Sequence, residues 1–205
     1  MNKLDLHIDF SCPFSYIGSE KLLQFIEKEN LPEDIVRFRS FLLNPTKDNV
    51  NKVFLENMTK KFGTSNIAET KERYRGIIEA AKRVGLNYDL DTIIDVNSKN
   101  AHKGLQFAIE EGKQNDYVRK VFSLHFEKGG DFNDLDTLVE VIKSIGLDGE
   151  KFLSNLDRLN ELVDKDLQLA ADRGVNSVPT FYANGRILLQ GTGSFEEFKQ
   201  ITDSL

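Results

Sequence analysis

A chain of 205 residues, of which 40% are hydrophobic and 29% are charged, has the composition of a globular protein that can bury a core. The formal net charge of −6 argues against nucleic-acid or anionic-membrane binding as the main role, so we expect neither partner. No apolar run approaches the roughly 20 residues of a membrane span, and the N-terminal MNKLDLHIDF alternates where a signal peptide would be continuously apolar.

The N-terminal segment predicts a strand, a helix and a second strand. Apolar and polar residues alternate over 4–10, which is the pattern of a strand. Ser11 offers an N-cap hydroxyl and Pro13 suits a first helical turn, and the apolar spacing extends this helix over 13–29. A second alternating run predicts a strand at about 34–43. Because a helix joins the two strands, we expect a right-handed β-α-β unit in which they are parallel.

The middle of the chain predicts helices only. Apolar residues recur at helical spacing and β-branched runs are few. Asp134 and Gly146 are the start and stop signals of one of these helices. The expected helices cover 48–62, 66–84, 97–112, 115–128, 134–145, 149–155 and 157–173.

Strand character returns near the C-terminus. A short run over 178–183 leads to Asn184-Gly185, whose residues favour a two-residue hairpin turn, and 186–189 forms the returning strand. Gly191 and Gly193 end that strand, and Ser194 caps a last helix. The chain is therefore predicted to be an α/β protein, in which a β-α-β half and a β-β-α half bracket a long helical stretch.

Cys12 is the only cysteine, and it lies where the first strand gives way to the first helix. Free backbone N–H groups and the helix dipole at such a position favour a thiolate, so we expect a lowered pKa and a reactive thiol at the carboxyl edge of the sheet. The alternative is a small buried hydrophobic residue. A single cysteine excludes an intramolecular disulfide and suits a reducing compartment, so we expect a cytoplasmic protein.

Other polar residues offer less specific signals. Asp9 lies three residues before Cys12 and would accept its proton if buried, although an exposed or capping carboxylate is the commoner outcome. Asp5, His7 and Asp9 share one strand face and suit a cation, but no fourth ligand is evident and we expect no metal. His102 is expected to be exposed at the start of a helix whose cap is Asn97 or Ser98.

Two further features have plain structural explanations. His125 is expected to pack near the end of its helix. The proline of Val178-Pro179 is acceptable at the first position of a strand, and the residues alone give no reason to expect a cis bond there.

Four segments together resemble the thioredoxin superfamily, specifically the DsbA-like branch with a helical insertion and, within it, the cytoplasmic FrnE-type oxidoreductases. The segments occur in the family's order. They are Asp9-x-x-Cys12-Pro13-Phe14-x-Tyr16-Ile17-Gly18, Asn97-Ser98-x-x-Ala101-His102, Gly174-Val175-x-x-Val178-Pro179-x-Phe181 and Gln190-Gly191-Thr192-Gly193.

The resemblance implies a thioredoxin-like domain formed by 1–46 and 157–205, interrupted by a helical insertion domain at 47–156. It implies that Cys12 is the attacking thiolate, that Pro179 is a cis-proline, and that the backbone of Val178 pairs with an extended thiol substrate. The remaining residues that it assigns to the substrate cleft are Pro13, Phe14, Tyr16, Asn100 and His102.

The sequence departs from the family at Ser15, where a dithiol enzyme has its second cysteine. That second thiol releases the substrate from the mixed disulfide, and serine cannot do this. The string CPFSYIG is also similar to the S-P-x-S-Y/W-L-G type string of kappa-class glutathione transferases and 2-hydroxychromene-2-carboxylate isomerases. There a serine at the position of Cys12 activates glutathione.

Three functions follow from these resemblances. The first is a thiol–disulfide oxidoreductase with a monothiol C-x-x-S site, whose adduct an external thiol resolves. The second is a glutathione-type transferase or isomerase, and the third is a non-enzymatic chaperone or redox-sensing scaffold. No tightly bound cofactor is expected, although glutathione or another small thiol would serve as co-substrate. The substrate is a protein or a small molecule with a thiol or disulfide. Both a monomer and a homodimer are compatible with the sequence.

Overall fold

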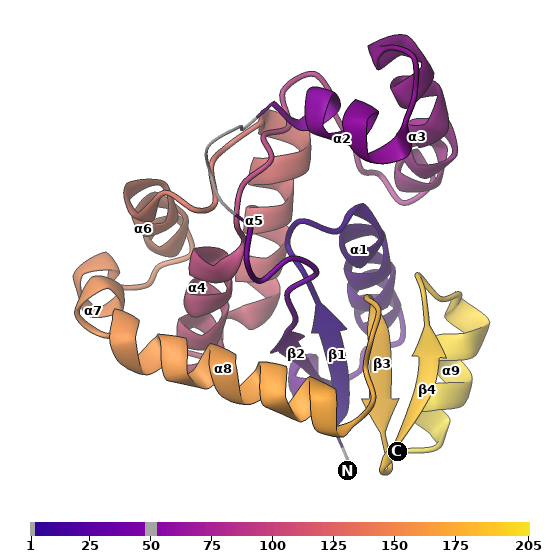
Figure 1. Ribbon diagram of the computed structural model, residues 1–205. Helices are drawn as coiled ribbons and strands as arrows, with labels where there is room; N and C mark the ends of the chain where they lie inside the picture. Colours follow the sequence, from indigo (N-terminus) through magenta and orange to yellow (C-terminus); the bar gives the residue numbers. More distant parts are fainter. Residues whose placement is uncertain (1–2, 48–52) are drawn as a thin grey trace.

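The computed structural model describes residues 3–47 and 53–205, and their centre is a four-stranded mixed sheet. The strand order is β2-β1-β3-β4. The β1–β2 pair is parallel, as predicted, and both later pairings are antiparallel. The strands, shown in Figure 1, are β1 (Leu4–Ile8), β2 (Val36–Ser40), β3 (Thr180–Ala183) and β4 (Arg186–Gln190).

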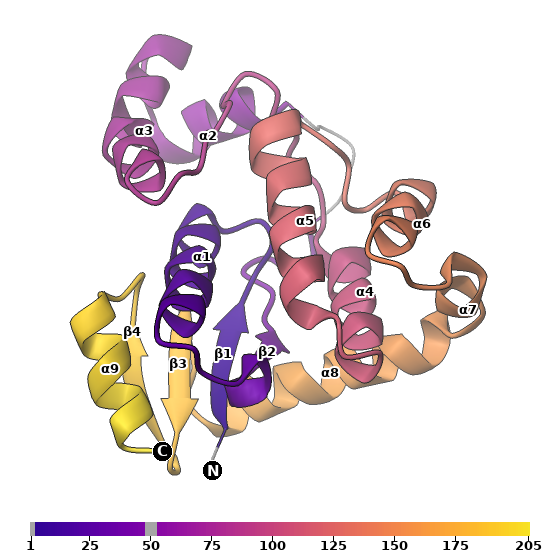
Figure 2. The same ribbon diagram turned by 180° about the vertical axis from the view of Figure 1, so that it is seen from behind.

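Helices cover both faces of this sheet. α1 (Pro13–Lys28) and α9 (Phe195–Asp203) pack on one face, whereas α8 (Leu156–Asp172) crosses the other face (Figures 1 and 2). The two ends of the chain thus form one layered unit, because β1 from the N-terminal half pairs directly with β3 from the C-terminal half.

The segment between β2 and α8 is helical, as the sequence predicts. α4 and α5 lie beside the sheet, and α2 and α3 extend past the carboxyl end of β1, near the start of α1 (Figure 1). A 3₁₀ turn at Glu33–Ile35 precedes β2. The helices are α2 (Phe54–Phe62), α3 (Ile67–Lys82), α4 (Lys99–Glu110), α5 (Gln114–Lys128), α6 (Leu135–Ser144) and α7 (Gly149–Ser154).

Most of the predicted elements occur, with shorter bounds. The strand predicted at 34–43 spans only Val36–Ser40 because the 3₁₀ turn takes its start. The helix predicted at 48–62 begins at Phe54, and the rest of that prediction, 48–52, lies outside the described residues.

The predicted end signals are mostly confirmed. The Asp134 side chain accepts a hydrogen bond from the Thr137 N–H at the start of α6. Asn184 and Gly185 have φ values of 52° and 77°, which a tight β3–β4 turn requires. The cap predicted at Ser11 is wrong: the N-cap of α1 is Cys12, because the Ser11 N–H bonds to Asp9 Oδ1 at 3.0 Å and Pro13 takes the first helical position.

A buried polar network fixes α8 against the sheet. Arg39 of β2 binds Asp5 of β1 at 2.8 Å and Asp166 of α8 at 3.1 Å. Arg173 binds the other Asp5 oxygen at 2.7 Å and lies 3.3 Å from Nε2 of His7. Arginine side chains thus contact Asp5 and His7, two of the three residues (Asp5, His7 and Asp9) on the strand face that suits a cation. No group of possible metal ligands occurs within 3–47 and 53–205.

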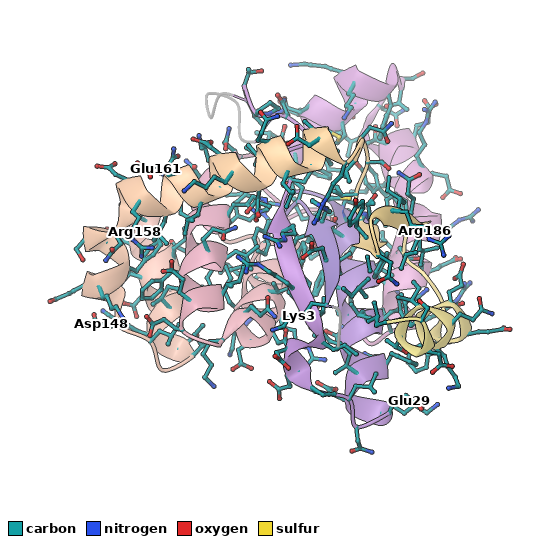
Figure 3. All side chains as sticks on the ribbon, turned by 90° about the horizontal axis from the view of Figure 1, so that it is seen from below. Lys3, Glu29, Asp148, Arg158, Glu161 and Arg186 are labelled. Atoms are coloured by element: carbon teal, nitrogen blue, oxygen red, sulfur yellow. The ribbon has the colours of Figure 1, made fainter. Side chains whose placement is uncertain are left out.

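The outer surface is charged. Figure 3 shows the exposed side chains of Asp148 and Glu29 near the edges of this view and that of Lys3 near its middle. No helix in the described part of the chain is both long enough and apolar enough to cross a membrane.

Candidate functional site

The turn between β1 and α1 positions Cys12. Its N–H donates to the Asp9 carbonyl oxygen at 3.0 Å, and Pro13 follows as the first residue of α1. Cys12 is therefore fixed at the carboxyl end of the central parallel strand, as the sequence predicts. The residue is only 5% exposed.

The Cys12 thiol faces the segment that precedes β3. Its Sγ lies 3.6 Å from the carbonyl oxygen of Val178, to which the thiol donates. The Val178–Pro179 peptide bond is cis, and the Pro179 carbonyl accepts from the Gly191 N–H at 2.9 Å. The structure thus brings Cys12 next to Val178 and Pro179, which follow it by 166 residues or more in sequence.

Gly18 allows this close approach. A Cβ on Gly18 would lie 2.9 Å from Cγ of Pro179 and 3.4 Å from Cα of Thr192. A Cβ at 2.9 Å from another carbon atom is closer than proteins allow. Any larger residue at position 18 would therefore displace the segment that contains Pro179. The glycine that ends the string CPFSYIG therefore has a packing role at the site.

Ser15 is fully buried in the first turn of α1. Its hydroxyl accepts a hydrogen bond from the Asp9 N–H at 3.4 Å and also hydrogen-bonds to the Cys12 sulfur. The side chain thus occupies the place where a second thiol would stand, and it contacts Cys12 without being able to form a disulfide.

The expected lowering of the Cys12 pKa is not found. Burial raises the pKa of the Cys12 thiol, and this outweighs the hydrogen bonds from the Ser15 hydroxyl and N–H. The Asp9 charge raises the Cys12 pKa further, and a hydrogen bond from the Phe14 N–H opposes it. The helix N-terminus does favour the thiolate, but the dry surroundings favour the neutral thiol more.

Asp9 is buried. An exposed or capping carboxylate is the commoner outcome for such a residue, and the structure differs from it in that the side chain is enclosed. Oδ1 accepts from the Ser11 N–H at 3.0 Å and the Ser98 hydroxyl at 2.6 Å, and Oδ2 accepts from the Leu43 N–H at 2.7 Å. Burial alone would raise the Asp9 pKa, but nearby His102 and these hydrogen bonds hold it below its usual value. Asp9 is therefore a buried carboxylate beside Cys12.

His102 lies behind Asp9 and not at the surface, so the expected exposure is wrong. It is 0% exposed, its ring packs 4.9 Å from that of Phe10, and Nε2 lies 3.8 Å from Asp9 Oδ1. Asn100 points elsewhere and donates to the Asn133 carbonyl at 2.8 Å. Neither side chain lines the pocket beside Cys12.

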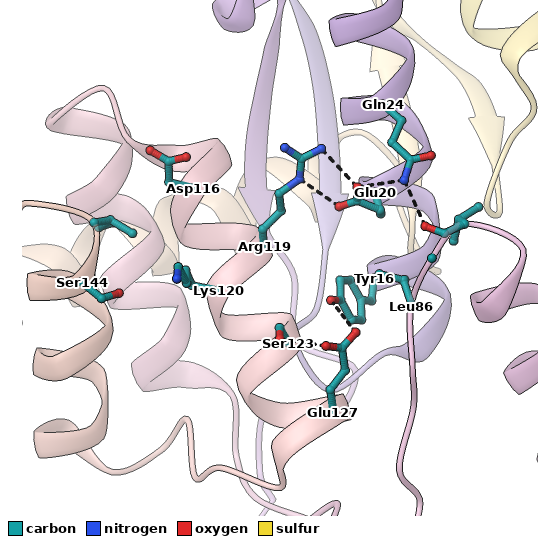
Figure 4. A pocket seen from close by; sticks show the side chains of 13 residues that line it. Tyr16, Glu20, Gln24, Leu86, Asp116, Arg119, Lys120, Ser123, Glu127 and Ser144 are labelled. Carbon is teal, nitrogen blue, oxygen red and sulfur yellow. Dashed lines mark hydrogen bonds and ion pairs between the residues drawn. The ribbon is translucent and has the colours of Figure 1, made fainter.

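Tyr16 faces away from Cys12. Its hydroxyl donates to Glu127 at 3.1 Å, and its ring stacks 4.9 Å from that of Phe122. Tyr16 and Glu127 line a separate pocket of about 750 Å³ between α1 and α5, where Arg119 pairs with Glu20 at 2.9 Å. Figure 4 shows these side chains. This placement follows from helical geometry, because Tyr16 projects from a different face of α1 than the Cys12 turn.

Pro13 and Phe14 differ in exposure. Pro13 lines the pocket beside Cys12, and its carbonyl accepts from the Tyr88 hydroxyl at 2.7 Å. Phe14 is 44% exposed and is not part of that pocket. His125, expected to pack near its helix end, is 3% exposed with its ring centroid 4.2 Å from that of Phe132.

A pocket of about 580 Å³ opens beside Cys12, toward α2 and α3. Besides Cys12, its walls include Lys47, Lys60, Tyr74 and Asp95. No sequence motif singles out these residues. The sequence predicts only that most of them belong to the helical segment. No local motif indicates that α2 and α3 lie near the start of α1.

Nearly the whole chain matches a family model. Residues 3–202 match the sequence model of the DSBA-like thioredoxin domain. The "Uncharacterized protein YwbO" of Bacillus subtilis (strain 168) is 23% identical over 208 residues, or 98% of this chain and 96% of that protein.

Three solved structures have a similar fold. The probable DsbA oxidoreductase SCO1869 from Streptomyces coelicolor has a TM-score of 0.86 at 23% identity, covering 100% of this chain and 89% of that one. A 2-hydroxychromene-2-carboxylate isomerase has a TM-score of 0.70 at 18% identity, covering 98% and 93%. The cytosolic disulfide reductase DsbM from Pseudomonas aeruginosa, solved with GSH, has a TM-score of 0.65 at 15% identity, covering 98% of both chains. These likenesses confirm the predicted thioredoxin-like fold with a helical insertion.

Proposed function

The chain belongs to the DSBA-like thioredoxin family, and on this basis we propose that it is a thiol–disulfide oxidoreductase that works with the single thiol of Cys12. The contact between Cys12 Sγ and the Val178 carbonyl, at 3.6 Å beside the cis-proline, carries the proposal. A sulfur held next to a backbone acceptor is suited to a substrate that binds in an extended form along Val178.

The proposed reaction has two exchange steps. The Cys12 thiolate attacks one sulfur of a disulfide, a new S–S bond forms to Cys12, and the other sulfur leaves as a thiolate that takes up a proton. An external thiolate then attacks the substrate sulfur of the mixed disulfide, forms a new S–S bond to it and releases Cys12 as a thiolate. Ser15 cannot replace that thiol, so the second step depends on a partner molecule.

Glutathione is the first candidate for the external thiol. The DsbM structure contains GSH, and its fold matches this chain with a TM-score of 0.65. The buried Asp9 carboxylate and the Ser15 hydroxyl lie on the protein side of Cys12. Asp9 and Ser15 are therefore two of the residues that influence the pKa of the Cys12 thiol.

The test is to incubate the protein with a small disulfide and to detect a Cys12 adduct by mass spectrometry. We expect one adduct per chain, its release on adding glutathione, and no adduct in Cys12→Ala. Failure of native Cys12 to form an adduct, when the unfolded chain forms one under the same conditions, would contradict the proposal.

A second candidate is a glutathione-dependent transferase or isomerase. The likeness to the 2-hydroxychromene-2-carboxylate isomerase, at a TM-score of 0.70, favours it, as does the downstream Ser15-Tyr16 pair. The variant Cys12→Ser separates the two functions. Turnover of an electrophile with glutathione that survives in Cys12→Ser supports the transferase, whereas disulfide exchange is lost in that variant.

A further inference from the structure

The pocket beside Cys12 has the size of a small-molecule site. Its volume is about 580 Å³, within the range of roughly 300–1,000 Å³ typical of ligand pockets. Ser11, Cys12 and Pro13 form one wall, and residues of α2 and α3 form the opposite wall. A molecule in this pocket therefore lies directly against the turn that carries the thiol.

Access to the thiol is narrow. Cys12 is 5% exposed, and helices α2 and α3 extend past the carboxyl end of β1, over the start of α1 (Figure 1). When a disulfide on the surface of a folded protein approaches Sγ, the backbone that flanks the disulfide must approach as well. Helices α2 and α3 hinder this approach sterically. A small disulfide meets no such obstacle.

The charged residues of this pocket are mainly lysines. Lys47, Lys60 and Lys61 line it, and among the described lining residues the one carboxylate is Asp95. Asp95 is already engaged by Lys47 Nζ at 2.5 Å and Asn57 Nδ2 at 2.7 Å. Within 3–47 and 53–205, no carboxylate lies at ion-pair distance from Lys60 or Lys61. Counting the residues that the structure describes, the pocket therefore has an excess of positive charge in a chain whose net charge is −6.

The same pocket has an apolar side. Phe54 and Tyr74 line it, with ring centroids 5.6 Å apart, and Met58 lies on the same helix as Phe54. Aromatic and methionine side chains provide adaptable apolar contact for a ligand. Lysines beside such a surface suit a ligand that has both an anionic and an apolar part.

Resting on the proposed chemistry of Cys12, we propose that this pocket selects low-molecular-weight disulfides that carry negative charge and an apolar portion, in preference to protein disulfides. Such a disulfide places its anionic group at Lys60 and Lys61 and its sulfur at Cys12. The Cys12 thiolate forms the new S–S bond, the old S–S bond breaks, and the departing thiolate takes a proton from solvent. The exchange needs no further oxidant.

The experiment compares rates of Cys12 adduct formation with three aryl disulfides that share one scaffold and carry carboxylate, carboxamide or quaternary ammonium groups. A small folded protein with one surface disulfide is the fourth substrate. We expect the carboxylate compound to react about tenfold or more faster than the carboxamide, because attractive charge raises association rates to this extent. The ammonium compound and the protein are expected to react more slowly than the carboxamide.

The double variant Lys60→Gln/Lys61→Gln should lose this preference, so that the carboxylate and carboxamide compounds react with it at similar rates. The control is Lys143→Gln/Lys199→Gln, whose lysines lie elsewhere on the surface in ion pairs with Glu140 and Asp203, and it should keep the preference. Equal rates for all three small disulfides, or a faster protein disulfide, overturn this inference and leave the proposed function intact. Absence of any adduct on the native chain overturns the proposed function itself.

Discussion

Nε2 of His102 lies 3.8 Å from Oδ1 of Asp9, and the two side chains are 0% and 1% exposed. Neither ring nitrogen of His102 has a hydrogen-bond partner among the described residues. The distance is too long for a hydrogen bond, yet the imidazole lowers the Asp9 pKa. It links the helical segment, through α4, to the turn that carries Cys12.

Replacing His102 by leucine is expected to raise the Asp9 pKa. Burial raises that pKa, and His102 with the surrounding hydrogen bonds currently outweighs this effect. Removing the imidazole leaves the carboxylate buried with less compensation. A ¹³C NMR titration of the Asp9 carboxyl carbon measures the shift, with a thermal melt to establish that the variant is folded. An unchanged Asp9 titration in a folded variant would show that His102 has no electrostatic role.

The Cys12 thiol should titrate above its ordinary value. Its alkylation rate should therefore keep increasing as the pH is raised past about 8.5, the usual value for a free cysteine. Because the Asp9 charge raises the Cys12 pKa, Asp9→Asn should lower it and speed alkylation at neutral pH. Thiolate absorbance in the ultraviolet gives the pKa directly. Slower alkylation at neutral pH in a folded Asp9→Asn variant would indicate that Asp9 acts as a base and not as a repelling charge.

Ser15→Cys should supply the missing resolving step. The serine hydroxyl already hydrogen-bonds to the Cys12 sulfur, so a thiol at this position starts close to a mixed disulfide on Cys12. We expect the substrate adduct to accumulate in the natural chain and to be released without external thiol in Ser15→Cys. Mass spectrometry of the quenched reaction distinguishes the two, and Ser15→Ala is the control that removes the hydroxyl without adding a thiol.

Gly18→Ala should destabilise the fold and slow exchange at Cys12. A helical glycine is normally less favourable than alanine by about 1 kcal/mol, so crowding against Pro179 must exceed this gain. Overpacking of this kind costs about 1–3 kcal/mol. The matched control is Gly76→Ala in α3, where an added Cβ meets nothing within 4 Å and stabilisation is expected. Denaturant unfolding of both variants gives the free energies, and stabilisation of equal size in both would contradict the crowding.

Acid should unfold the chain through its buried histidines. Burial lowers the pKa of His7 and of His125 to about 4, against an ordinary value of 6.5. The unfolded chain therefore binds more protons than the folded chain between these values, and the stability that is full above pH 6.5 is lost as the pH falls toward 4. Each histidine contributes at most about 3 kcal/mol. Urea unfolding across this pH range measures the loss, and His125→Phe should reduce the slope.

The helices and strands whose apolar residues follow a periodic spacing could be predicted from the sequence. The site could be predicted only in part. Alternation gave β1 and helical spacing gave α1, since a segment's own pattern decides which face is buried. The partnership of Cys12 with Val178 came only from a family resemblance, because no local pattern connects distant segments. The raised Cys12 pKa was missed because it depends on how completely the neighbours exclude water, which only tertiary packing determines. The direction of Tyr16 was missed for the same reason.

The contact between Cys12 and Val178 couples proton loss to substrate docking. In the resting state the thiol donates to the Val178 carbonyl and so blocks the acceptor that an extended substrate would use. A thiolate has no proton to donate and is repelled by that oxygen. Ionisation of Cys12 therefore makes the sulfur nucleophilic and at the same time frees the Val178 carbonyl to accept a hydrogen bond from the substrate. A docked substrate in turn favours the ionised form of Cys12.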